Sequence, residues 1–428
     1  MASILIFEAA SRLEPENHAL AADRLIPTED AAYSFWPDVA CSVGEQSANP
    51  ANSLKRVIRE IGLICAVVGV AVIAATFAAH ADPLPAPAMS ASLAANADPY
   101  GVDLDWAGKW SVGGALSGLA YDQDNSNFGT HSQADLDNGQ VWIEKKDGWW
   151  QFYVQAGAYS LPSLGTGYIK SSLAPALLYG DVPVAYVKLA PTDDFSIAAG
   201  KLPTLIGAEY VFTFQNLNIQ RGLLWNQEPS VSNGVQANWS RGPLSLSVSW
   251  NDGFYSKRLD WVSALASYGF NGGSDTVAVV ASGNLGRNPE RLGFATPVFN
   301  DGDIYNLIYT HSSGSWTISP YVQYVRAADG SDSAAAALLV NYAFDDHWKL
   351  AGRIEYVGSN GVTNIAVAGP GSSAWSVTLT PTYQYQRVFA RLEGSYLGAS
   401  DITPGSAYGP ALDRDSQASV FFETGVLL

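Results

Sequence analysis

The chain has 428 residues, with 23 Lys/Arg against 40 Asp/Glu and a formal charge of −17. So acidic a chain is not expected to bind nucleic acid. Its two cysteines, Cys41 and Cys65, both precede residue 82, so the remainder of the chain forms no disulfide and carries no cysteine redox chemistry. The mean hydropathy is only +0.03 despite 13 Trp and 21 Tyr, a balance that arises when apolar and polar residues alternate.

The N-terminal part contains a pattern typical of a secretory signal. Lys55-Arg56 precede the apolar run 61–79, and small residues occupy the expected cleavage positions up to Ala81. We therefore expect residues 54–81 to be a signal peptide that is cleaved after Ala81. The apolar run is nearly long enough to cross a bilayer, so a transmembrane anchor is the alternative.

A signal that begins this late in a chain is unusual. We expect residues 1–53 to be a leader of doubtful translation, with the true start near Leu54 or Val57 at a non-Met codon. Residues 82–105 are rich in Pro and Ala and are expected to form a flexible lead-in.

From Trp106 to Leu428 apolar and polar residues alternate with a period of two, which predicts β-strands. The clearest unit is the hairpin 375–396, which turns near Gln386 and has one apolar face and one polar face. Its strands are about ten residues long, enough to cross a membrane, whereas strands of soluble proteins usually have about five or six residues. Seventeen candidate strands result: 110–121, 140–146, 149–159, 182–190, 194–202, 210–224, 233–240, 244–251, 261–270, 276–282, 303–310, 316–325, 335–344, 348–357, both strands of the hairpin, and 416–428.

Bacterial membrane barrels have an even number of strands, so one candidate is wrong, and 210–224 is the least regular. We predict an all-β fold, a transmembrane antiparallel β-barrel of about 16 strands, over residues 106–428. Aromatic residues near the strand ends favour interfacial girdles. A soluble β-protein is the alternative, but it needs a second layer over the apolar faces, and no helical segment supplies one. Short turns alternate with longer loops as in outer-membrane barrels: the turns 146–148 and 241–243, and the loops 122–137, 283–300 and 357–373.

Three motifs narrow the function. They are AAGKLPTLIGAE (198–209), NIQRGLLWNQEP (218–229) and SVSWNDGFYSKR (247–258). With these motifs the chain resembles the OmpL-like β-barrel porin family of Gram-negative bacteria, and the likeness in strand pattern extends from about Trp106 to Leu428. The resemblance implies a passive outer-membrane channel that is surrounded by lipid and passes small polar solutes or ions. Trimers are common among porins, so a homotrimer fits, although no stretch specifies an interface.

About sixteen strands enclose a pore too wide for side chains to fill. Residues 204–229, where the strand pattern lapses, are the expected place for a segment that folds inward and narrows the pore. Charged and hydrogen-bonding groups at such a constriction determine which solutes pass. The candidate constriction residues are Lys201, Glu209, Arg221 and Glu228. The alternative is that they are turn or rim residues, or pair with one another.

Charged residues within the regular strands should face the lumen, because an Arg or Lys that faces lipid costs about 2–4 kcal/mol at the bilayer midplane. The predicted lumen-wall residues are Lys349, Arg353, Glu355, Arg391 and Glu393. Residues 1–81 hold five Lys/Arg and nine Asp/Glu, so residues 82–428 carry a formal charge of −13. We expect a weak preference for cations.

Catalytic and metal signatures are weak. After Ala81 the histidines are His131, His311 and His347, in contexts typical of loops, and a Ser–His pair needs a third orienting group. The residues from Asp122 onward resemble the start of a calcium-binding EF-hand loop. The loop requires a glycine at its sixth position and a glutamate at its twelfth, where this chain has Asn127 and Gln133. We therefore expect no enzyme activity, cofactor or metal. The alternative functions are an outer-membrane barrel hydrolase and a structural or adhesive barrel with a closed lumen.

Overall fold

The computed structural model describes residues 93–94, 96, 98–104, 108–127, 131–286, 301–364 and 368–428. The predicted leader 1–53, the signal peptide 54–81 and most of the lead-in 82–105 lie outside the described residues, as does most of the loop 283–300.

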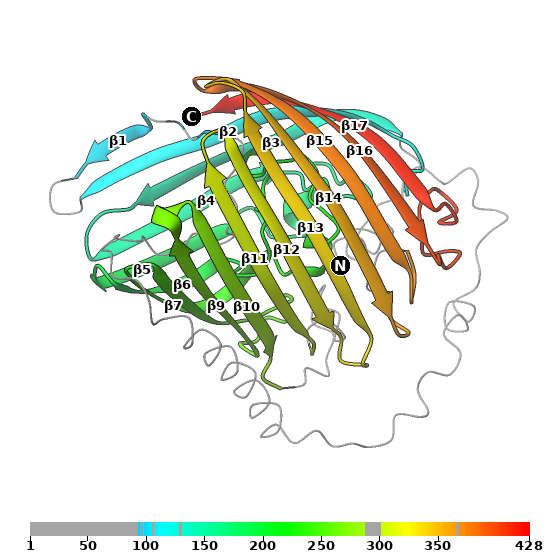
Figure 1. Ribbon diagram of the computed structural model, residues 1–428. Coiled ribbons are helices and arrows are strands. Elements are labelled where there is room, and N and C mark those ends of the chain that lie inside the picture. The colour runs from blue at the N-terminus through cyan, green and yellow to red at the C-terminus, as the bar shows by residue number, and fades with distance from the viewer. Residues whose placement is uncertain are drawn as a thin grey trace.

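Sixteen long strands in the described part of the chain close into one antiparallel barrel (Figure 1). Each strand pairs with the next, and the last pairs back with the first of the barrel, with Leu427 opposite Ala115. The strands are β2 (Lys109–Gln123), β3 (Ser132–Lys145), β4 (Trp150–Tyr159), β5 (Val184–Thr192), β6 (Phe195–Pro203), β7 (Val231–Arg241), β8 (Leu244–Asn251), β9 (Trp261–Phe270), β10 (Asp275–Asn284), β11 (Asp303–Ser313), β12 (Trp316–Arg326), β13 (Asp332–Ala343), β14 (Trp348–Asn360), β15 (Ser373–Tyr385), β16 (Val388–Ser400) and β17 (Ser416–Leu427). The predicted barrel is confirmed, and 210–224 is the candidate that forms no strand.

A further strand, β1 (Tyr100–Asp103), lies outside the ring. It pairs with the start of β2, where Asp103 is opposite Lys109. This is the same edge of β2 that pairs with β17 farther along, and Leu428 and Gly114 exchange backbone hydrogen bonds of 2.8 and 3.2 Å between the two pairings. The strand β1 therefore pairs with the part of the β2 edge that β17 does not reach.

The two ends of the barrel differ. Tight connections such as 242–243 and 386–387 lie at one end, the short-turn end, together with the C-terminus. Long connections such as 160–183 and 204–230 lie at the other, the long-loop end. The predicted loop 122–137 was too long, since β3 begins at Ser132, and β14 likewise continues to Asn360. Strands that extend past the membrane have water on both faces, so they lose the alternation that reveals a strand in the sequence.

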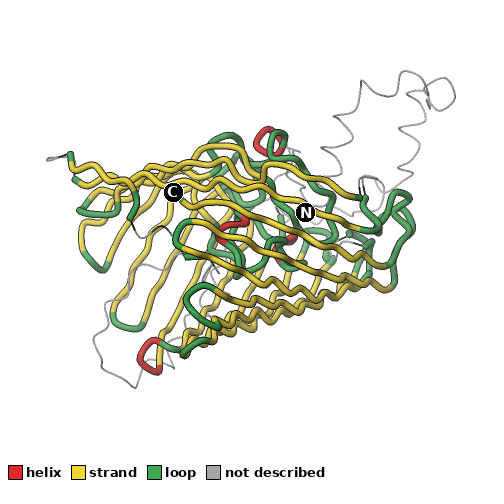
Figure 2. Tube along the Cα trace, turned by 90° about the horizontal axis from the view of Figure 1, so that it is seen from above, coloured by secondary structure: helices red, strands yellow, loops and turns green. Residues whose placement is uncertain are grey.

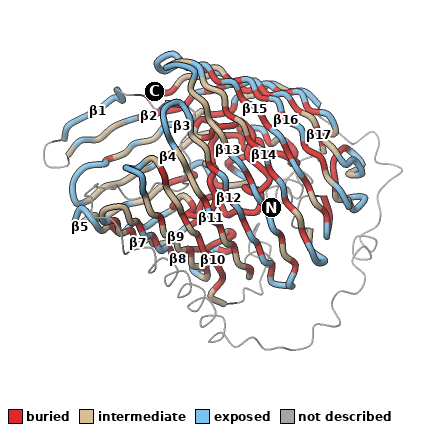
Figure 3. Tube along the Cα trace, in the orientation of Figure 1, coloured by how far each residue is buried: buried red, intermediate tan, exposed pale blue. Residues whose placement is uncertain are grey.

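Burial alternates along the strands as the pleat requires, and on β15 every second residue from Ala374 to Gln384 is buried (Figure 3). The outer face is apolar and exposed. Trp375 contacts Tyr396 near the long-loop end, with ring centroids 5.4 Å apart, and Trp348 contacts Tyr383 near the short-turn end at 4.9 Å. Eight residues along a strand span roughly 26 Å, or about 20 Å along the axis of a barrel tilted by about 40°. The outer face thus has the apolar band and aromatic girdles of a membrane barrel.

The helices are short, and in the described residues none is long and apolar enough to span a bilayer. One, α4 (Ala174–Leu177), is in the β4–β5 connection, and η4 (Asn271–Gly273) is in the β9–β10 turn. The 3-10 turns η2 (Thr213–Gln215) and η3 (Trp225–Gln227) belong to the β6–β7 connection. This connection, residues 204–230, runs within the ring of strands (Figure 2) and is called the inward segment below.

Candidate functional site

The inward segment is not a strand because its backbone bonds to wall side chains and to another loop. Glu393 on β16 accepts the backbone N–H groups of Ile219 (2.5 Å) and Gln220 (2.9 Å). At Arg221 the backbone bonds to the β4–β5 connection, donating to Pro162 O at 3.0 Å. Since buried peptide groups need partners, these contacts fix the path of the segment across the lumen.

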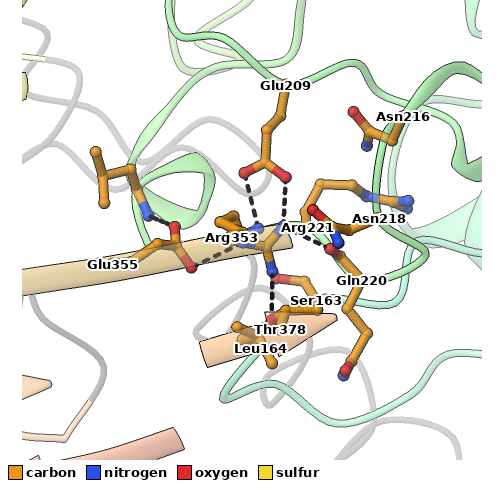
Figure 4. A network of polar contacts seen from close by, with 12 residues as sticks. Ser163, Leu164, Glu209, Asn216, Asn218, Gln220, Arg221, Arg353, Glu355 and Thr378 are labelled. Atoms are coloured by element: carbon orange, nitrogen blue, oxygen red, sulfur yellow. Dashed lines mark hydrogen bonds and ion pairs between the residues drawn. The ribbon is translucent and has the colours of Figure 1, made fainter. Parts of the chain in front are cut away.

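One buried arginine joins the inward segment to β14. Arg353 Nη1 lies 2.6 Å from Glu209 Oε1 and donates to Gln220 O at 2.8 Å, and its Nε donates to Glu355 Oε2 at 3.0 Å (Figure 4). The Arg353 side chain is fully buried, as is that of Glu355, and Glu209 is 3% exposed. Breaking a buried pair costs about 3–5 kcal/mol, because a charge is left without compensation. This pair therefore holds the segment firmly.

A second buried arginine holds the segment to β16 and β17. Arg391 Nε donates to Glu423 Oε2 at 3.0 Å, and its terminal nitrogens donate to the carbonyl oxygens of Asn216 (3.0 Å) and Thr213 (2.8 Å). The Thr213 hydroxyl in turn donates to Asp137 Oδ2 at 2.5 Å. The segment is thus anchored at two points on the wall.

Asp137 and Glu423 were missed by the sequence analysis. The predicted alternation of the last strand places Glu423 on the face opposite Phe422 and Val426, so the sequence contained a signal for it. Asp137 lies at a β-bulge, where the register of β2 and β3 shifts between Ser117 and Gly118. A bulge turns an extra side chain inward, and the period-two pattern does not reveal it.

Apolar contacts fill the lumen between the inward segment and β10 to β16. Leu217, Leu223 and Leu224 pack against small or aliphatic residues of the wall, including Ala278, Ile308, Ala335, Ala337 and Leu339. All of them are buried. The inward segment therefore lies against one side of the barrel.

The predicted constriction residues have different positions. Lys201 is on β6, on the same face of the strand as the exposed Ile197 and on the opposite face from the buried Leu202. Its ammonium donates to the carbonyl oxygens of Tyr179 and Val182 in the β4–β5 connection. Lys201 is therefore on the outer face of the wall, and the expectation that it lies at the constriction is wrong, because in the alternation of β6 it shares the face of the exposed residues.

Arg221 is fully buried in the inward segment. Its Nη1 donates to Ile219 O at 3.2 Å, and its guanidinium carbon lies 5.6 Å from the centre of the Trp225 ring. Burial lowers the pKa of Arg221 to about 10, against the attraction of Asp137 and Glu209, so the residue stays charged at neutral pH. The stacking on Trp225 is a cation–π contact.

Glu228 is also buried, and neither of its carboxyl oxygens has a hydrogen-bond partner among the described residues. The carboxyl group packs against Gly207, where a Cβ would lie only 2.0 Å from Oε2 and where φ is +81°. Burial, together with nearby Glu209 and Glu355, raises the pKa of Glu228 well above its ordinary range. The carboxyl group therefore stays neutral to a higher pH than an exposed glutamate does.

The structure places the predicted lumen-wall residues on one face of their strands. Arg353, Glu355, Arg391 and Glu393 are buried on the inner face. Lys349 has the same parity on β14 and is half-buried near the short-turn end. In the described part of the chain no group of three or more His, Cys, Asp or Glu residues is arranged to hold a metal ion.

Two adjoining cavities lie on the other side of the inward segment, along β2 to β6. The first, of about 340 Å³, is at the short-turn end and is lined by Trp142, Glu144 and Lys146, with Leu93 of the lead-in at its edge. The second, of about 180 Å³, extends toward the long-loop end and is lined by Gln155, Tyr186, Thr204, Glu209 and Ser230. Tyr153, Tyr210 and Gln215 line both.

Comparisons with solved structures agree with this architecture. The trimer form of in-vitro folded OmpT, an outer membrane protein of Vibrio cholerae, matches with a TM-score of 0.51 and 13% identity, over 74% of this chain and 99% of that chain. A loop L8 deletion mutant of OmpT has a TM-score of 0.50 and 14% identity over the same shares. Salmonella typhi OmpF in complex with daunomycin has a TM-score of 0.49 and 12% identity, over 75% of this chain and 98% of that chain. The two OmpT structures show a shared barrel fold.

One curated relative has a different description. The beta-ketoacyl-[acyl-carrier-protein] synthase III of Paramagnetospirillum magneticum is 25% identical over 186 residues, 43% of this chain and 56% of that protein. The chain thus spans just over half the length of this relative, and the identity is too low to show a common family.

The family model described as "Putative beta-barrel porin-2, OmpL-like" matches residues 109–428, which is the whole ring from β2 to β17. The chain therefore belongs to this family of OmpL-like porins, and it is a porin-type β-barrel of the outer membrane.

Proposed function

We propose that the chain is a passive diffusion channel for small polar solutes or ions. The observation that carries the proposal is the inward segment, fixed inside a closed barrel by the buried Arg353–Glu209 pair. A segment held in this way narrows a wide barrel without breaking its wall, and the groups along the narrowed path then select what passes. Outer-membrane barrels have short periplasmic turns, so we assign the short-turn end to the periplasm.

The proposed path follows the two adjoining cavities along β2 to β6. Glu209 lines the second cavity while paired with Arg353, so we assign it to the constriction. Arg221 and Glu228 are buried in the packing of the inward segment, and we assign them the role of holding its shape. Arg353, Glu355, Arg391 and Glu393 act from the wall as its anchors.

The hydrolase alternative has one geometric feature in its favour. His311 Nδ1 lies 2.7 Å from Asp275 Oδ1, as in the orienting half of a catalytic triad. The neighbouring hydroxyl of Ser312, however, donates to Thr317 Oγ1 at 3.4 Å. The Asp275 carboxylate also accepts the Tyr309 hydroxyl at 2.5 Å, so the pair is part of a network of side chains on adjoining strands. We propose that the protein is not an enzyme.

We also propose a homotrimer. One of the OmpT structures that share the barrel fold is described as a trimer form. In such a trimer, lipid surrounds the part of the apolar band that is not buried between subunits. Sedimentation in detergent, with the detergent mass subtracted, distinguishes a trimer from a monomer.

The central test is single-channel conductance in a planar bilayer, with protein purified from outer membranes. Stable steps whose current is proportional to voltage are the expected result. A folded barrel that never conducts would support the structural or adhesive alternative. Hydrolysis that is lost in a His311→Ala variant would support the enzyme alternative.

A further inference from the structure

We infer that the two adjoining cavities form a binding site for neutral carbohydrate rings along the channel. The inference rests on the proposed channel function and adds a class of solute to it. It starts from the composition of the lining, in which aromatic faces and side-chain amides meet on one wall while the charged groups are paired with one another.

Aromatic rings line both cavities. In the first cavity Trp142 is stacked on Phe214, with centroids 5.7 Å apart and planes 5° apart. In the second cavity Tyr153 is stacked on Tyr186 at 5.8 Å and 21°. A core could bury such rings on all sides, but these rings border open volume. A sugar ring has an apolar C–H face that can pack on an aromatic face in the same way as a second aromatic ring does.

Hydrogen-bonding groups stand beside these rings. The Tyr153 hydroxyl donates to Gln155 Oε1 at 2.7 Å, and Gln155 Nε2 donates to Gln140 Oε1 at 2.5 Å. Gln215 lines both cavities, and Thr204 lines the second. Amides and hydroxyls donate and accept, so this row matches the hydroxyl groups around the edge of a sugar. Apolar faces with a few placed polar groups are the usual composition of a small-molecule site.

The charges of the lining favour a neutral solute. Glu144 is paired with Lys146 at 2.8 Å, and Glu209 is paired with Arg353 at 2.6 Å. The two glutamate side chains that line the cavities therefore each have a cationic partner in the protein. A charged solute would have to leave water without a new counter-charge, which is costly, whereas a sugar exchanges hydrogen bonds with water for hydrogen bonds with the lining.

The experiment is block of the ion current by sugar. Glucose and maltose, added at millimolar concentrations to the short-turn side of the bilayer, should reduce the current in a saturable manner. Glutamine, a zwitterion with an amide, is the matched solute and should block much less. In Trp142→Leu and Tyr153→Leu the concentration for half block should rise roughly 2- to 10-fold, the equivalent of one lost stacking contact.

Two further variants control for folding and for ring removal in general. Tyr153→Phe keeps the ring and should retain most of the block. Tyr356→Leu removes a ring from the outer face, where Tyr356 is 54% exposed, and should leave the block unchanged. A channel that conducts ions but is not blocked by sugar, or is blocked equally by glutamine, overturns the carbohydrate inference and leaves the channel standing. A folded barrel without conductance overturns the channel itself.

Discussion

Arg353 of β14 and Glu209 of the inward segment are 144 positions apart in the sequence, yet Nη1 and Oε1 lie 2.6 Å apart inside the barrel. The pair is desolvated, because the Arg353 side chain is fully buried and that of Glu209 is 3% exposed. A wall strand and the segment that narrows the lumen are thus joined by a single guanidinium, which also bonds to Glu355.

Replacing Arg353 by Met should loosen the inward segment. Glu209 and Glu355 would keep their burial and lose their cation, a loss of about 3–5 kcal/mol for a broken buried pair. On gel electrophoresis the folded barrel migrates faster than the unfolded chain, and the temperature at which this fast-migrating band disappears should fall. The channel current should become larger and noisier.

Lys349→Met is the matched control for this variant. Lys349 is on the same face of β14 but lies near the short-turn end, so its replacement should leave both measurements near those of the unmodified protein. Adding Glu209→Gln to Arg353→Met should recover part of the stability, since neighbouring effects are not additive. Unchanged stability and current in Arg353→Met would show that the pair does not hold the segment.

The pH dependence of stability should reveal Glu228. Its folded pKa is raised well above the ordinary range by burial, whereas in the unfolded chain a Glu titrates near pH 4.3. At a pH between these two pKa values, the folded state therefore holds a proton that the unfolded state has lost. The contribution of this group to stability is full below about pH 4.3 and declines as pH rises toward its folded pKa.

Glu228→Gln mimics the neutral carboxyl group and should flatten this decline. The measurement is thermal unfolding of the barrel from pH 5 to pH 9 in both proteins, with Glu144→Gln as a control carboxylate that is already paired. Equal slopes in Glu228→Gln and the unmodified protein would contradict the assignment.

The strands of the barrel wall can be predicted from the sequence more completely than the contacts inside the lumen. Alternation as in Trp375, Val377 and Leu379 predicted the strands, because a lipid-facing and a lumen-facing side chain must differ at each step. The lapse of that pattern between 204 and 229 located the inward segment. Even Arg353 and Arg391 were assigned to the inner face by the cost of a charge in lipid.

The residues that pair with Arg353 and Arg391 could not be predicted from a single sequence. The contact of Glu209 with Arg353 is a long-range one that no spacing rule encodes. Asp137 was lost in a predicted loop because a bulge shifts the register at that point. Lys201 is close in sequence to the inward segment, but one step along a strand reverses the side on which a residue lies.

Tyr255 should control the long-loop end of the path. Its hydroxyl oxygen accepts the backbone N–H of Ser230 at 3.0 Å and lies 3.4 Å from the Tyr179 hydroxyl, so three connections meet at one atom. Tyr255→Phe leaves the Ser230 N–H without this acceptor, at a cost of about 1–3 kcal/mol for a buried group. The channel should open more often, with little change in the barrel itself.

Single-channel recording measures the open fraction, and Tyr268→Phe on the outer face of β9 is the control for loss of a tyrosine hydroxyl. If both variants open as often as the unmodified protein, the three connections are held together by other contacts.

Ion selectivity should be weakly cationic and sensitive to salt. Residues 82–428 carry a formal charge of −13, but Glu144 and Glu209 in the two cavities are paired with cations, so the preference arises mainly near the mouths. Screening shortens the reach of such charges from about 10 Å at 0.1 M salt to about 3 Å at 1 M. The reversal potential in a tenfold KCl gradient should therefore indicate cation preference at low salt and approach neutrality at high salt.

The pair Glu144 and Lys146 offers opposite controls at the first cavity, since their charged atoms lie 2.8 Å apart. Glu144→Gln leaves the ammonium uncompensated and should shift the reversal potential toward anions, whereas Lys146→Gln should shift it toward cations. Shifts of the same sign in both variants would exclude a path past this pair. Clear anion selectivity in the unmodified protein would contradict the prediction, because it would require that unpaired cations dominate the mouths of an acidic barrel.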